Sequence, residues 1–565
     1  MLAKRHSVAF SSQSFLPAFS RYRAVSRFPR PGGSFVHTTV FSGAIVGIEG
    51  LVVEVEVDIA RGIPAFSVVG LPNASVREAR ERVTAAIKNS GCHFPLERIT
   101  CNLAPADVKK EGSAHDLAIA IGILLASGQA EATTVRTLFI GELALDGGLR
   151  RIPGVLPILL HARERGFARA AIPFGNLEEA RVVEGLEVIA CETLRAAMAM
   201  ALAMPERASS GGDSFDATLD GRVVVKRADE PAPAFVSSAA SSSFDMVDVV
   251  GQEAAKRALM IAAAGGHHVL MVGPPGAGKT MLARRFPSIL PPLSPARALE
   301  TTMIYSIMGL LHRVSAHGGI VTRAPFRAPH HTASYAGLIG GTATPRPGEI
   351  TLAHNGVLFL DELPEFTRHT LETLREPLEE GHITISRAKS SVTFPARFQL
   401  IAAMNPCLCG YQGSSIKQCR CSPLQIENYI GKISGPLLDR IAVHVSVRPV
   451  DVEAWNAAGR GGRLTSTAMR EMVVRAREIQ ERRFAGMNGV DCNARIPEGM
   501  FSALCAMDSA AEKVFMEAQK SHLVSARGRG HIVRLARTIA DLDGSKRIAE
   551  RHITEAVGYR GRDSR

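Results

Sequence analysis

The chain has 565 residues, of which 46% are hydrophobic and 21% are charged, and its formal net charge is +12. This length is too great for one small module, and the composition excludes wholesale disorder because it can bury several hydrophobic cores. Nine cysteines are too few for a secreted disulfide scaffold, and no apolar run reaches the roughly 20 residues that span a bilayer. We therefore expect a soluble, cytoplasmic protein of about three or four domains, with an anionic partner such as nucleic acid or a phosphate-rich ligand.

Residues 1–37 are predicted to form a basic leader or tail outside the folded protein. The first acidic residue of the chain is Glu49, whereas six Lys or Arg residues precede it among many Ser, Phe and Ala. This composition is typical of an organelle transit peptide. We favour instead a disordered tail or a start codon placed too far upstream.

Residues 38–204 are expected to form an α/β domain. Residues 52–57 alternate apolar and acidic side chains, which predicts a half-buried strand. Residues 75–89 carry their apolar side chains on one face and predict an amphipathic helix, and a second helix is expected at 116–127. Residues 205–243 are rich in Ser, Ala, Gly and Pro, which predicts a flexible interdomain linker.

A nucleotide-binding α/β domain is predicted at residues 244–450. An apolar strand at 268–272 precedes GPPGAGKT, and a helix follows, which is the context that a phosphate-binding loop requires. Lys279 is expected to reach the β- and γ-phosphates of ATP, and the Thr280 hydroxyl is expected to ligate Mg²⁺. The full nucleotide-binding loop comprises Gly273, Pro274, Pro275, Gly276, Ala277, Gly278, Lys279 and Thr280.

Two further strand ends carry candidate catalytic side chains. The apolar run at 357–360 ends in Asp361 and Glu362, which matches a Walker B segment. Asp361 should hold the Mg²⁺ shell, and Glu362 should orient and polarise the attacking water. The next strand, at 399–404, ends at Asn405, whose amide is expected to position the same water.

These three strand ends, in this order, resemble the AAA+ ATPases. The resemblance implies two further catalytic residues. Arg440 in GPLLDRI looks like the arginine finger that reaches the γ-phosphate of a neighbouring subunit, and Arg534 in HIVRLARTIADL looks like the sensor 2 arginine. A finger that acts on a neighbour implies a ring-shaped homo-oligomer.

Longer motifs narrow this resemblance to one family. NLAPADVKKEGSAHDLAIAIGIL, RAPFRAPHHTASYAGLIGGTATPRPGEITLAHNGVLFLDELPEF and MNPCLCGY resemble the YifB/ComM family of magnesium-chelatase-like AAA+ proteins. The resemblance covers about residues 38–560. It implies a Lon-protease-like (S5-type) N-terminal α/β domain, a central P-loop AAA+ α/β domain, and a helical C-terminal chelatase-type domain at residues 451–565. It also implies a hexameric DNA helicase that drives branch migration during transformation.

A hairpin is predicted at residues 381–392, where two β-branched runs flank a short basic tip. If this hairpin faces the pore of a ring, Arg387 and Lys389 would contact the phosphate backbone of DNA without sequence specificity. A solvated charged hairpin is the alternative.

Four of the cysteines lie close together in the sequence. Cys407-x-Cys409 and Cys419-x-Cys421 can supply a tetrahedral zinc site, although structural zinc sites usually separate paired cysteines by two residues. Reduced structural or redox-active thiols are the alternative. The neighbouring histidines of PHHT, His330 and His331, have no Cys or carboxylate beside them at ligand spacing. We interpret them as part of a structural or ATP-coupled loop.

Peptidase activity is not expected of the first domain. In KEGSAHD, Ala114 stands at the position of the Lon nucleophile, and Arg150 stands where the Lon lysine belongs. Arg stays protonated at neutral pH and cannot act as the base. Ser113 with Lys109 or Lys110 is the residual pairing.

The sequence therefore predicts an ATP hydrolase that acts as a ring-shaped, ATP-driven motor on branched or single-stranded DNA. Two alternatives stay open. One is a chelatase-type subunit that remodels its partners so that Mg²⁺ enters a porphyrin. The other is an ATP-dependent protease or unfoldase, against which the missing catalytic pair argues.

Overall fold

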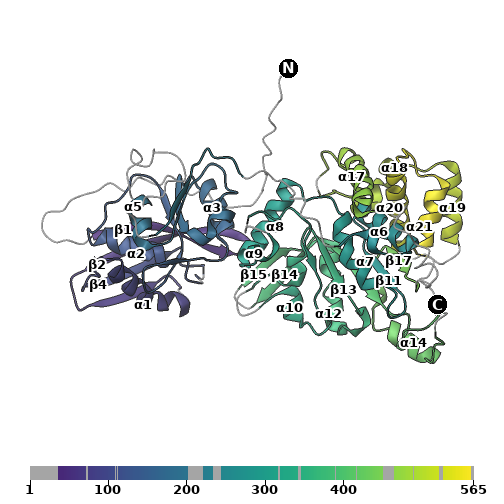
Figure 1. The fold of residues 1–565 in the computed structure, drawn as a ribbon, viewed down its shortest axis with the longest axis horizontal. Helices are drawn as coiled ribbons and strands as arrows, with labels where there is room; N and C mark the ends of the chain where they lie inside the picture. Colours follow the sequence, from purple (N-terminus) through teal and green to yellow (C-terminus); the bar gives the residue numbers. More distant parts are fainter. Residues whose placement is uncertain are drawn as a thin grey trace, which may run out of the picture.

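The fold is α/β and contains two open sheets, one in each half of the chain (Figure 1). The computed structural model describes residues 36–71, 74–108, 110, 112–201, 221–232, 244–315, 319–341, 345–387, 390–414, 417–449, 464–487, 489–520 and 526–560. Residues 1–35 of the predicted leader lie outside this set, as do residues 205–220 and 233–243 of the predicted linker. Residues 36 and 37, the last of the predicted leader, instead begin the first strand. No helix among the described residues is both long and apolar enough to cross a bilayer.

The N-terminal half is built on an eight-stranded mixed sheet with the order β10-β9-β8-β5-β1-β2-β4-β3. Its strands are β1 (Val36–Val46), β2 (Glu49–Ala60), β3 (Ala65–Val69), β4 (Arg98–Ala104), β5 (Thr137–Phe139), β8 (Arg169–Pro173), β9 (Glu187–Cys191) and β10 (Val223–Lys226). A small hairpin joins β6 (Glu142–Leu143) to β7 (Leu149–Arg150). The helices are α1 (Ala74–Asn89), α2 (Asp116–Ala126), α3 (Val155–Glu164), α4 (Leu177–Ala180) and α5 (Leu194–Ala201).

The alternating pattern that predicted a strand at 52–57 lies within β2. Val53, Val55 and Val57 are fully buried, and the acidic residues between them are partly exposed, so one face of the strand forms the core. Helix α2 covers that face, and its Gly122 lies so close to Val57 that a Cβ would come within 2.6 Å of the valine side chain. Both predicted helices of this half are present.

The prediction of a flexible linker is wrong at residues 223–226. These residues form β10, which pairs antiparallel with β9 at the edge of the sheet. Val223 is buried and joins the hydrophobic core of the N-terminal half. The three consecutive valines favour an extended backbone and supply the apolar surface that this edge requires. The composition predicts a linker here because the residues around these valines are rich in Ser, Ala and Pro.

The second sheet has five parallel strands in the order β12-β13-β16-β11-β17. They are β11 (Val269–Val272), β12 (Phe326–Arg327), β13 (Val357–Leu360), β16 (Gln399–Met404) and β17 (Val443–Ser446). The accompanying helices are α6 (Glu253–Gly265), α7 (Lys279–Arg285), α8 (Pro295–Ile307), α9 (Leu311–Val314), α10 (Tyr335–Ile339), α11 (Glu349–Leu352), α12 (Arg368–Glu372), α13 (Arg375–Glu380), α14 (Pro423–Ile430) and α15 (Gly435–Leu438).

A separate two-stranded hairpin pairs β14 (His382–Arg387) with β15 (Ser390–Pro395), at the place where the sequence predicts one. Its inner side chains Ile383, Ile385 and Phe394 are buried in the core that lies on one face of the five-stranded sheet. The hairpin is therefore anchored at its base.

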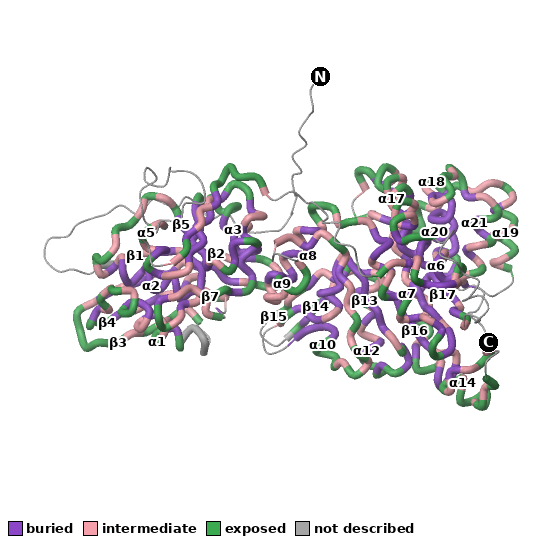
Figure 2. The backbone as a smooth tube through the Cα atoms, in the orientation of Figure 1, coloured by how far each residue is buried: buried purple, intermediate pink, exposed green. Residues whose placement is uncertain are grey.

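Helices of the C-terminal segment lie on the opposite side of that sheet, where α6 lies against the strands. They are α17 (Ser466–Arg483), α18 (Phe501–Leu504), α19 (Ser509–Lys520), α20 (Ala526–Leu542) and α21 (Glu550–Gly558). Helices α17 and α20 pack on α6 and share one continuous core with β11 and β17. Figure 2 shows this buried layer between the sheet and the C-terminal helices.

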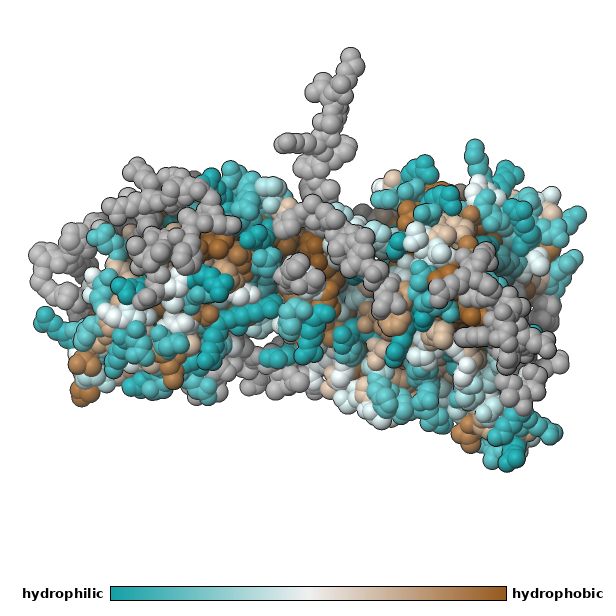
Figure 3. All heavy atoms as spheres, in the orientation of Figure 1, coloured by the Kyte–Doolittle hydropathy of each residue, from teal (hydrophilic) through white to brown (hydrophobic). Residues whose placement is uncertain are grey.

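The two halves meet where α3 packs against α8. Leu299 and Met303 of α8 pack against the hydrophobic core of the N-terminal half. The Ser306 hydroxyl donates a 2.5 Å hydrogen bond to the buried carboxylate of Glu179, and the Gly154 N–H donates to the Ser306 carbonyl at 2.9 Å. Hydrophobic side chains gather at this junction on the face shown in Figure 3. The contact therefore joins the halves through both apolar and polar groups.

Candidate functional site

The carboxyl ends of three neighbouring parallel strands bring the predicted nucleotide-site residues together. Strand β11 leads into the phosphate loop, β16 ends at Asn405, and β13 ends at Asp361. Val272 pairs with Met404, and Leu360 pairs with Ala402, so the three strand ends lie along one edge. In open parallel sheets ligands bind at this edge.

Lys279 lies at the centre of the phosphate loop. Its ammonium donates hydrogen bonds to the carbonyls of Gly273 at 2.6 Å and Pro274 at 2.9 Å, and to the side-chain oxygen of Asn405 at 3.1 Å. The side chain is almost buried, and this burial lowers its pKa, while the carboxylates of Asp361 and Glu362 oppose that shift. A cation held among acceptors in this way is ready to exchange them for phosphate oxygens.

Thr280 and Asp361 are the two predicted Mg²⁺ ligands, and they are already in contact. The Thr280 hydroxyl donates a 2.6 Å hydrogen bond to Oδ2 of Asp361. The other carboxylate oxygen of Asp361 accepts the Glu362 N–H at 3.0 Å. A hydroxyl and a carboxylate at this separation are oxygen donors of the kind that Mg²⁺ binds beside phosphates.

The backbone of the loop also fits a phosphate group. Gly276 and Gly278 have positive φ angles of 76° and 94°, and a Cβ on either would enter open space. Their N–H groups therefore lie in a left-handed turn with free space around it, and helix α7 begins directly after this turn. Such a turn at a helix N-terminus binds phosphate oxygens through backbone N–H groups.

Sequence reasoning missed two residues that contact this site. The sequence indicates only that His331 belongs to a structural or ATP-coupled loop, whereas in the fold its Nδ1 lies 3.3 Å from a carboxylate oxygen of Glu362. Gln252, which begins α6, donates from its amide to the Ala277 carbonyl at 3.2 Å and to the Arg448 carbonyl. Neither residue has a local signal, because both reach the site from segments remote from it in the sequence.

The two arginines assigned by resemblance occupy different surroundings. Arg440 pairs with Glu379 of α13 and donates to the Pro436 carbonyl at 2.6 Å. Arg534 on α20 donates to the Ile496 carbonyl at 2.8 Å, and its pKa is lowered by burial. The hydrogen bonds found for these guanidiniums in the described chain do not include a residue of the phosphate loop.

The predicted DNA contacts fall at the tip of the β14–β15 hairpin. Arg387 ends β14, and its pairing partner across the hairpin is Ser390. Lys389 lies outside the described residues, so its place remains a sequence prediction.

All four clustered cysteines come together. The Sγ atom of Cys407 lies 3.4 Å from that of Cys409 and 3.6 Å from that of Cys419, and the Cys409 and Cys419 sulfurs are 3.6 Å apart. Together with Cys421, they form a group whose sulfur atoms all lie within 4.8 Å of one another. The remaining cysteines are distributed elsewhere: Cys92, Cys101, Cys191, Cys492 and Cys505.

Of the residual protease pairings in the first half, that of Ser113 with Lys110 is not assembled. The Ser113 hydroxyl donates to the carboxylate of Glu142, whereas the ammonium of Lys110 donates to the Pro105 carbonyl. Arg150 lies beside the same glutamate, 3.8 Å away. Lys109 lies outside the described residues. A serine bound to a carboxylate and a lysine bound to a carbonyl do not form a nucleophile and base.

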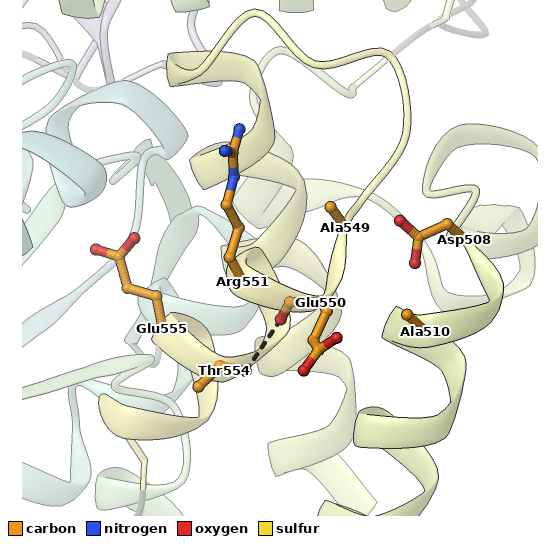
Figure 4. A pocket seen from close by; sticks show the side chains of 7 residues that line it. All are labelled: Asp508, Ala510, Ala549, Glu550, Arg551, Thr554 and Glu555. Carbon is orange, nitrogen blue, oxygen red and sulfur yellow. Dashed lines mark hydrogen bonds between the residues drawn. The ribbon is translucent and has the colours of Figure 1, made fainter.

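A shallow pocket of about 680 Å³ lies among the C-terminal helices, away from the phosphate loop (Figure 4). Within the lining, the Thr554 hydroxyl donates to the Glu550 carbonyl one turn earlier in α21, at 3.0 Å. The lining contains three carboxylates and one guanidinium, and it contributes none of the nucleotide-site residues. Its lining residues are Asp508, Ala510, Ala549, Glu550, Arg551, Thr554 and Glu555.

Three protein-family models match the chain. Residues 55–176 match "Subunit ChlI of Mg-chelatase", and residues 245–455 match "Magnesium chelatase, subunit ChlI". Residues 463–560 match "Magnesium chelatase, subunit ChlI C-terminal". The second of these models includes the phosphate loop, the Walker B segment and the cysteine group.

Similarity to individual proteins extends over almost the whole chain. Competence protein ComM of Haemophilus influenzae is 40% identical over 523 residues, which cover 92% of this chain and 97% of that protein. The uncharacterized protein YifB of Escherichia coli is 40% identical over 535 residues, which cover 94% and 97%. Lon protease 2 of Bacillus subtilis is 31% identical over 147 residues, 25% of this chain and 26% of that protein, which is consistent with a Lon-like N-terminal half.

Proposed function

The chain belongs to the YifB/ComM family of magnesium-chelatase-like AAA+ ATPases, and we propose that it assembles into a ring that uses ATP hydrolysis to drive branch migration of DNA. One observation carries the ATPase part of this proposal. Lys279, Asn405, Thr280 and Asp361 meet at one sheet edge through direct hydrogen bonds. The relative named as a competence protein supports a role with DNA.

Each residue at this edge has a proposed task. Lys279 exchanges its carbonyl partners for the β- and γ-phosphates and neutralises their charge. Thr280 and Asp361 hold Mg²⁺, which supplies charge neutralisation at the phosphates when bound. Glu362 accepts a proton from the attacking water, and Asn405 orients that water while it also positions Lys279.

The ring is supported by the position of Arg440. In this chain its guanidinium is bound by Glu379, which also pairs with Arg527 at 3.0 Å. In the proposed hexamer Arg440 is the finger directed at the nucleotide of the neighbouring subunit, and Arg534 contacts the nucleotide of its own subunit.

DNA binding is proposed for the hairpin of β14 and β15. The base of this hairpin is fixed by buried Ile383, Ile385 and Phe394, so its tip is carried on a rigid support. Arg387 and Lys389 at the tip would contact phosphates, which gives affinity without base recognition. Phosphate contacts of this type predict DNA binding that weakens steeply as salt rises.

The test measures ATP hydrolysis with and without single-stranded and four-way DNA over a salt series. We expect DNA to stimulate hydrolysis, and we expect the wild-type protein to move a four-way junction in the presence of ATP. Lys279→Ala should abolish both activities, whereas Arg387→Ala combined with Lys389→Ala should keep the DNA-independent rate and lose the stimulation. A protein whose ATPase is indifferent to DNA, and which leaves branched substrates unchanged, would refute the DNA role.

The chelatase alternative rests on the three family models, which bear the name of a magnesium chelatase subunit. It predicts ATP hydrolysis stimulated by a porphyrin-binding partner and not by DNA, so the same assay separates the two functions. The protease alternative has no support at Ser113, which is bound to Glu142.

A further inference from the structure

The four clustered cysteines form a compact group directly after the strand that ends at Asn405. Cys407 is buried and the other three are partly exposed. Three pairs of sulfur atoms are separated by 3.4, 3.6 and 3.6 Å, and all four lie within 4.8 Å of one another. Two segments contribute one C-x-C pair each, so the chain must fold back on itself to assemble the group.

These distances distinguish between the species that four thiols can form. A disulfide would bring two sulfurs to about 2.05 Å, far closer than any pair here. Four thiolates around one zinc ion, each about 2.3 Å from the metal, lie about 3.8 Å apart along every edge of the tetrahedron. The three separations among Cys407, Cys409 and Cys419 are close to this value, and the Cys421 sulfur lies within 4.8 Å of each of the others. An iron–sulfur cluster places several iron and sulfide atoms between the thiolates and requires a wider cage.

The surroundings of the sulfur atoms also suit thiolates. The Cys409 N–H points at the Cys421 sulfur at 3.3 Å, and the Cys421 N–H points at the Cys419 sulfur at 3.5 Å. Four thiolates and one Zn²⁺ carry a net charge of −2, and the exposed Lys417 and Arg420 lie within the same loop. Backbone donors and nearby cations both stabilise such a charge.

We propose that Cys407, Cys409, Cys419 and Cys421 bind one Zn²⁺ ion as a closed tetrathiolate site that holds the end of β16 against the phosphate loop. Each thiol loses its proton to solvent as the metal binds, and no redox change takes place. Four protein ligands leave no open position, so the ion is structural.

The position of the group explains how the ion acts on the nucleotide site. Cys407 lies two residues after Asn405, whose side-chain oxygen accepts from Lys279. Gly410, within the same loop, approaches the phosphate loop so closely that a Cβ would meet Pro275 at 2.7 Å. At the other end, Cys421 immediately precedes the capping box of Ser422 and Gln425 that starts α14. The metal thus fixes a loop whose one end positions Asn405 and whose body contacts the phosphate loop.

The first experiment measures metal in the purified full-length protein by mass spectrometry. We expect about one zinc per chain in the wild type and in the control Cys92→Ser, whose cysteine lies outside the group. Cys409→Ser combined with Cys419→Ser should contain almost none. Cobalt exchanged into the wild type should give the intense visible absorption of tetrahedral Co²⁺–thiolate. Iron in place of zinc, or no metal in the wild type, overturns the proposal.

The second experiment tests the positioning role and separates it from misfolding. We expect the zinc-free double variant to keep its circular dichroism spectrum and to bind a fluorescent ADP analogue within about threefold of the wild type, while kcat for ATP falls at least tenfold. A zinc-free variant that hydrolyses ATP normally contradicts the positioning role. If the wild-type protein binds zinc but the double variant unfolds outright, the metal serves folding alone, and this result also contradicts the positioning role. Because zinc content is measured without ATP or DNA, failure of the motor function leaves this test intact.

Discussion

Two glycines of the phosphate loop are required for different physical reasons. Gly273 has no room for a side chain, because a Cβ there would lie 2.1 Å from the carbonyl oxygen of Val447. Gly278 has open space around it but a left-handed backbone, with φ of 94°. The first glycine therefore serves the packing of β11 against β17, and the second leaves the loop open for phosphate.

The substitutions Gly273→Ala and Gly278→Ala should separate these roles. Gly273→Ala forces a backbone shift, and we expect it to lower the free energy of unfolding by about 1–3 kcal/mol. Gly278→Ala should lose roughly 1–2 kcal/mol from its left-handed backbone, but it should also abolish the rise in melting temperature that Mg-ADP causes. Thermal melts with and without Mg-ADP measure both effects. A Gly278→Ala protein that Mg-ADP stabilises as fully as wild type would contradict this assignment.

His331 is the described residue that contacts the proposed catalytic carboxylate Glu362, at 3.3 Å. The contact occupies a carboxylate oxygen of Glu362 and so competes with the attacking water for it, which restrains hydrolysis until the contact breaks. We expect His331→Ala to raise the DNA-independent kcat about 2- to 10-fold, the range that corresponds to one hydrogen bond of roughly 0.5–1.5 kcal/mol. DNA should then stimulate the rate less than it does in the wild type.

His330→Ala is the matched control for this prediction. His330 lies beside His331, with the ring centroids 4.1 Å apart, but it makes its hydrogen bond to Thr332 at 2.8 Å. Steady-state ATPase assays of the two variants should therefore differ. Equal rates in both variants would show that the contact does not restrain hydrolysis, and a lower rate in His331→Ala would show that it supports hydrolysis.

At the scale of elements, the turn between β1 and β2 connects the N-terminal half to the hairpin. Ile48 in this turn packs against the core that contains the base of the hairpin and against the small cluster around Tyr305. At Gly47 a Cβ would lie 3.1 Å from the side chain of Val392 on β15. The N-terminal half is thus positioned to support the element to which we assign DNA contact.

We expect Ile48→Asp to separate the β1–β2 turn from the β14–β15 hairpin. A charge at this partly buried contact would displace the turn from the hairpin, so DNA-stimulated hydrolysis should fall several-fold while the DNA-independent rate stays unchanged. Val46→Asp is the control, because Val46 belongs to the same strand end and is 46% exposed. Parallel ATPase titrations with DNA measure the effect. If both aspartates act alike, the turn has no specific role in coupling.

At the scale of the whole molecule, three histidines lie near the boundary between the ATPase sheet and the C-terminal helices, and His267 is buried there. His267 bonds to Thr538 of α20 at 2.8 Å, and His268 accepts the Leu400 N–H at 3.0 Å. His531 of α20 contacts the Asp439 carbonyl at 2.9 Å. Burial lowers the pKa of His267 well below its usual range, that of His268 to about 4, and that of His531 to about 3.

These shifts predict that acid destabilises the folded protein. In the unfolded chain the histidines gain protons as the pH falls below about 6.5, whereas in the folded chain they stay neutral to much lower pH. The unfolded state therefore binds more protons, and the free energy of unfolding should decrease from pH 6.5 to pH 4, by an amount on the order of 1–2 kcal/mol per histidine at pH 5. Urea unfolding at several pH values measures this slope.

His268→Gln provides the control, because glutamine can accept the same N–H without titrating. The variant should show a shallower loss of stability between pH 6.5 and 5 than the wild type. A stability that stays constant over this interval in the wild type would contradict the proposed burial of the neutral histidines.

Local patterns in the sequence were sufficient to identify the elements that carry the nucleotide site. The strands β13 and β16 have the predicted limits, and the phosphate loop lies between β11 and α7. Even the proximity of Thr280 and Asp361 was predictable, because the carboxyl ends of neighbouring parallel strands share one edge. Periodicity and loop composition act over a few residues, so a single sequence displays them directly.

Contacts between distant segments were decided only by the tertiary structure. The sequence did not indicate that residues 223–226 complete the N-terminal sheet, or that His331 reaches Glu362. Nor did it decide between separated thiols and the compact group formed by the two C-x-C pairs. Such contacts depend on how whole layers of helices and strands pack together. Many weak interactions between distant residues determine this packing, so a local sequence pattern cannot indicate it.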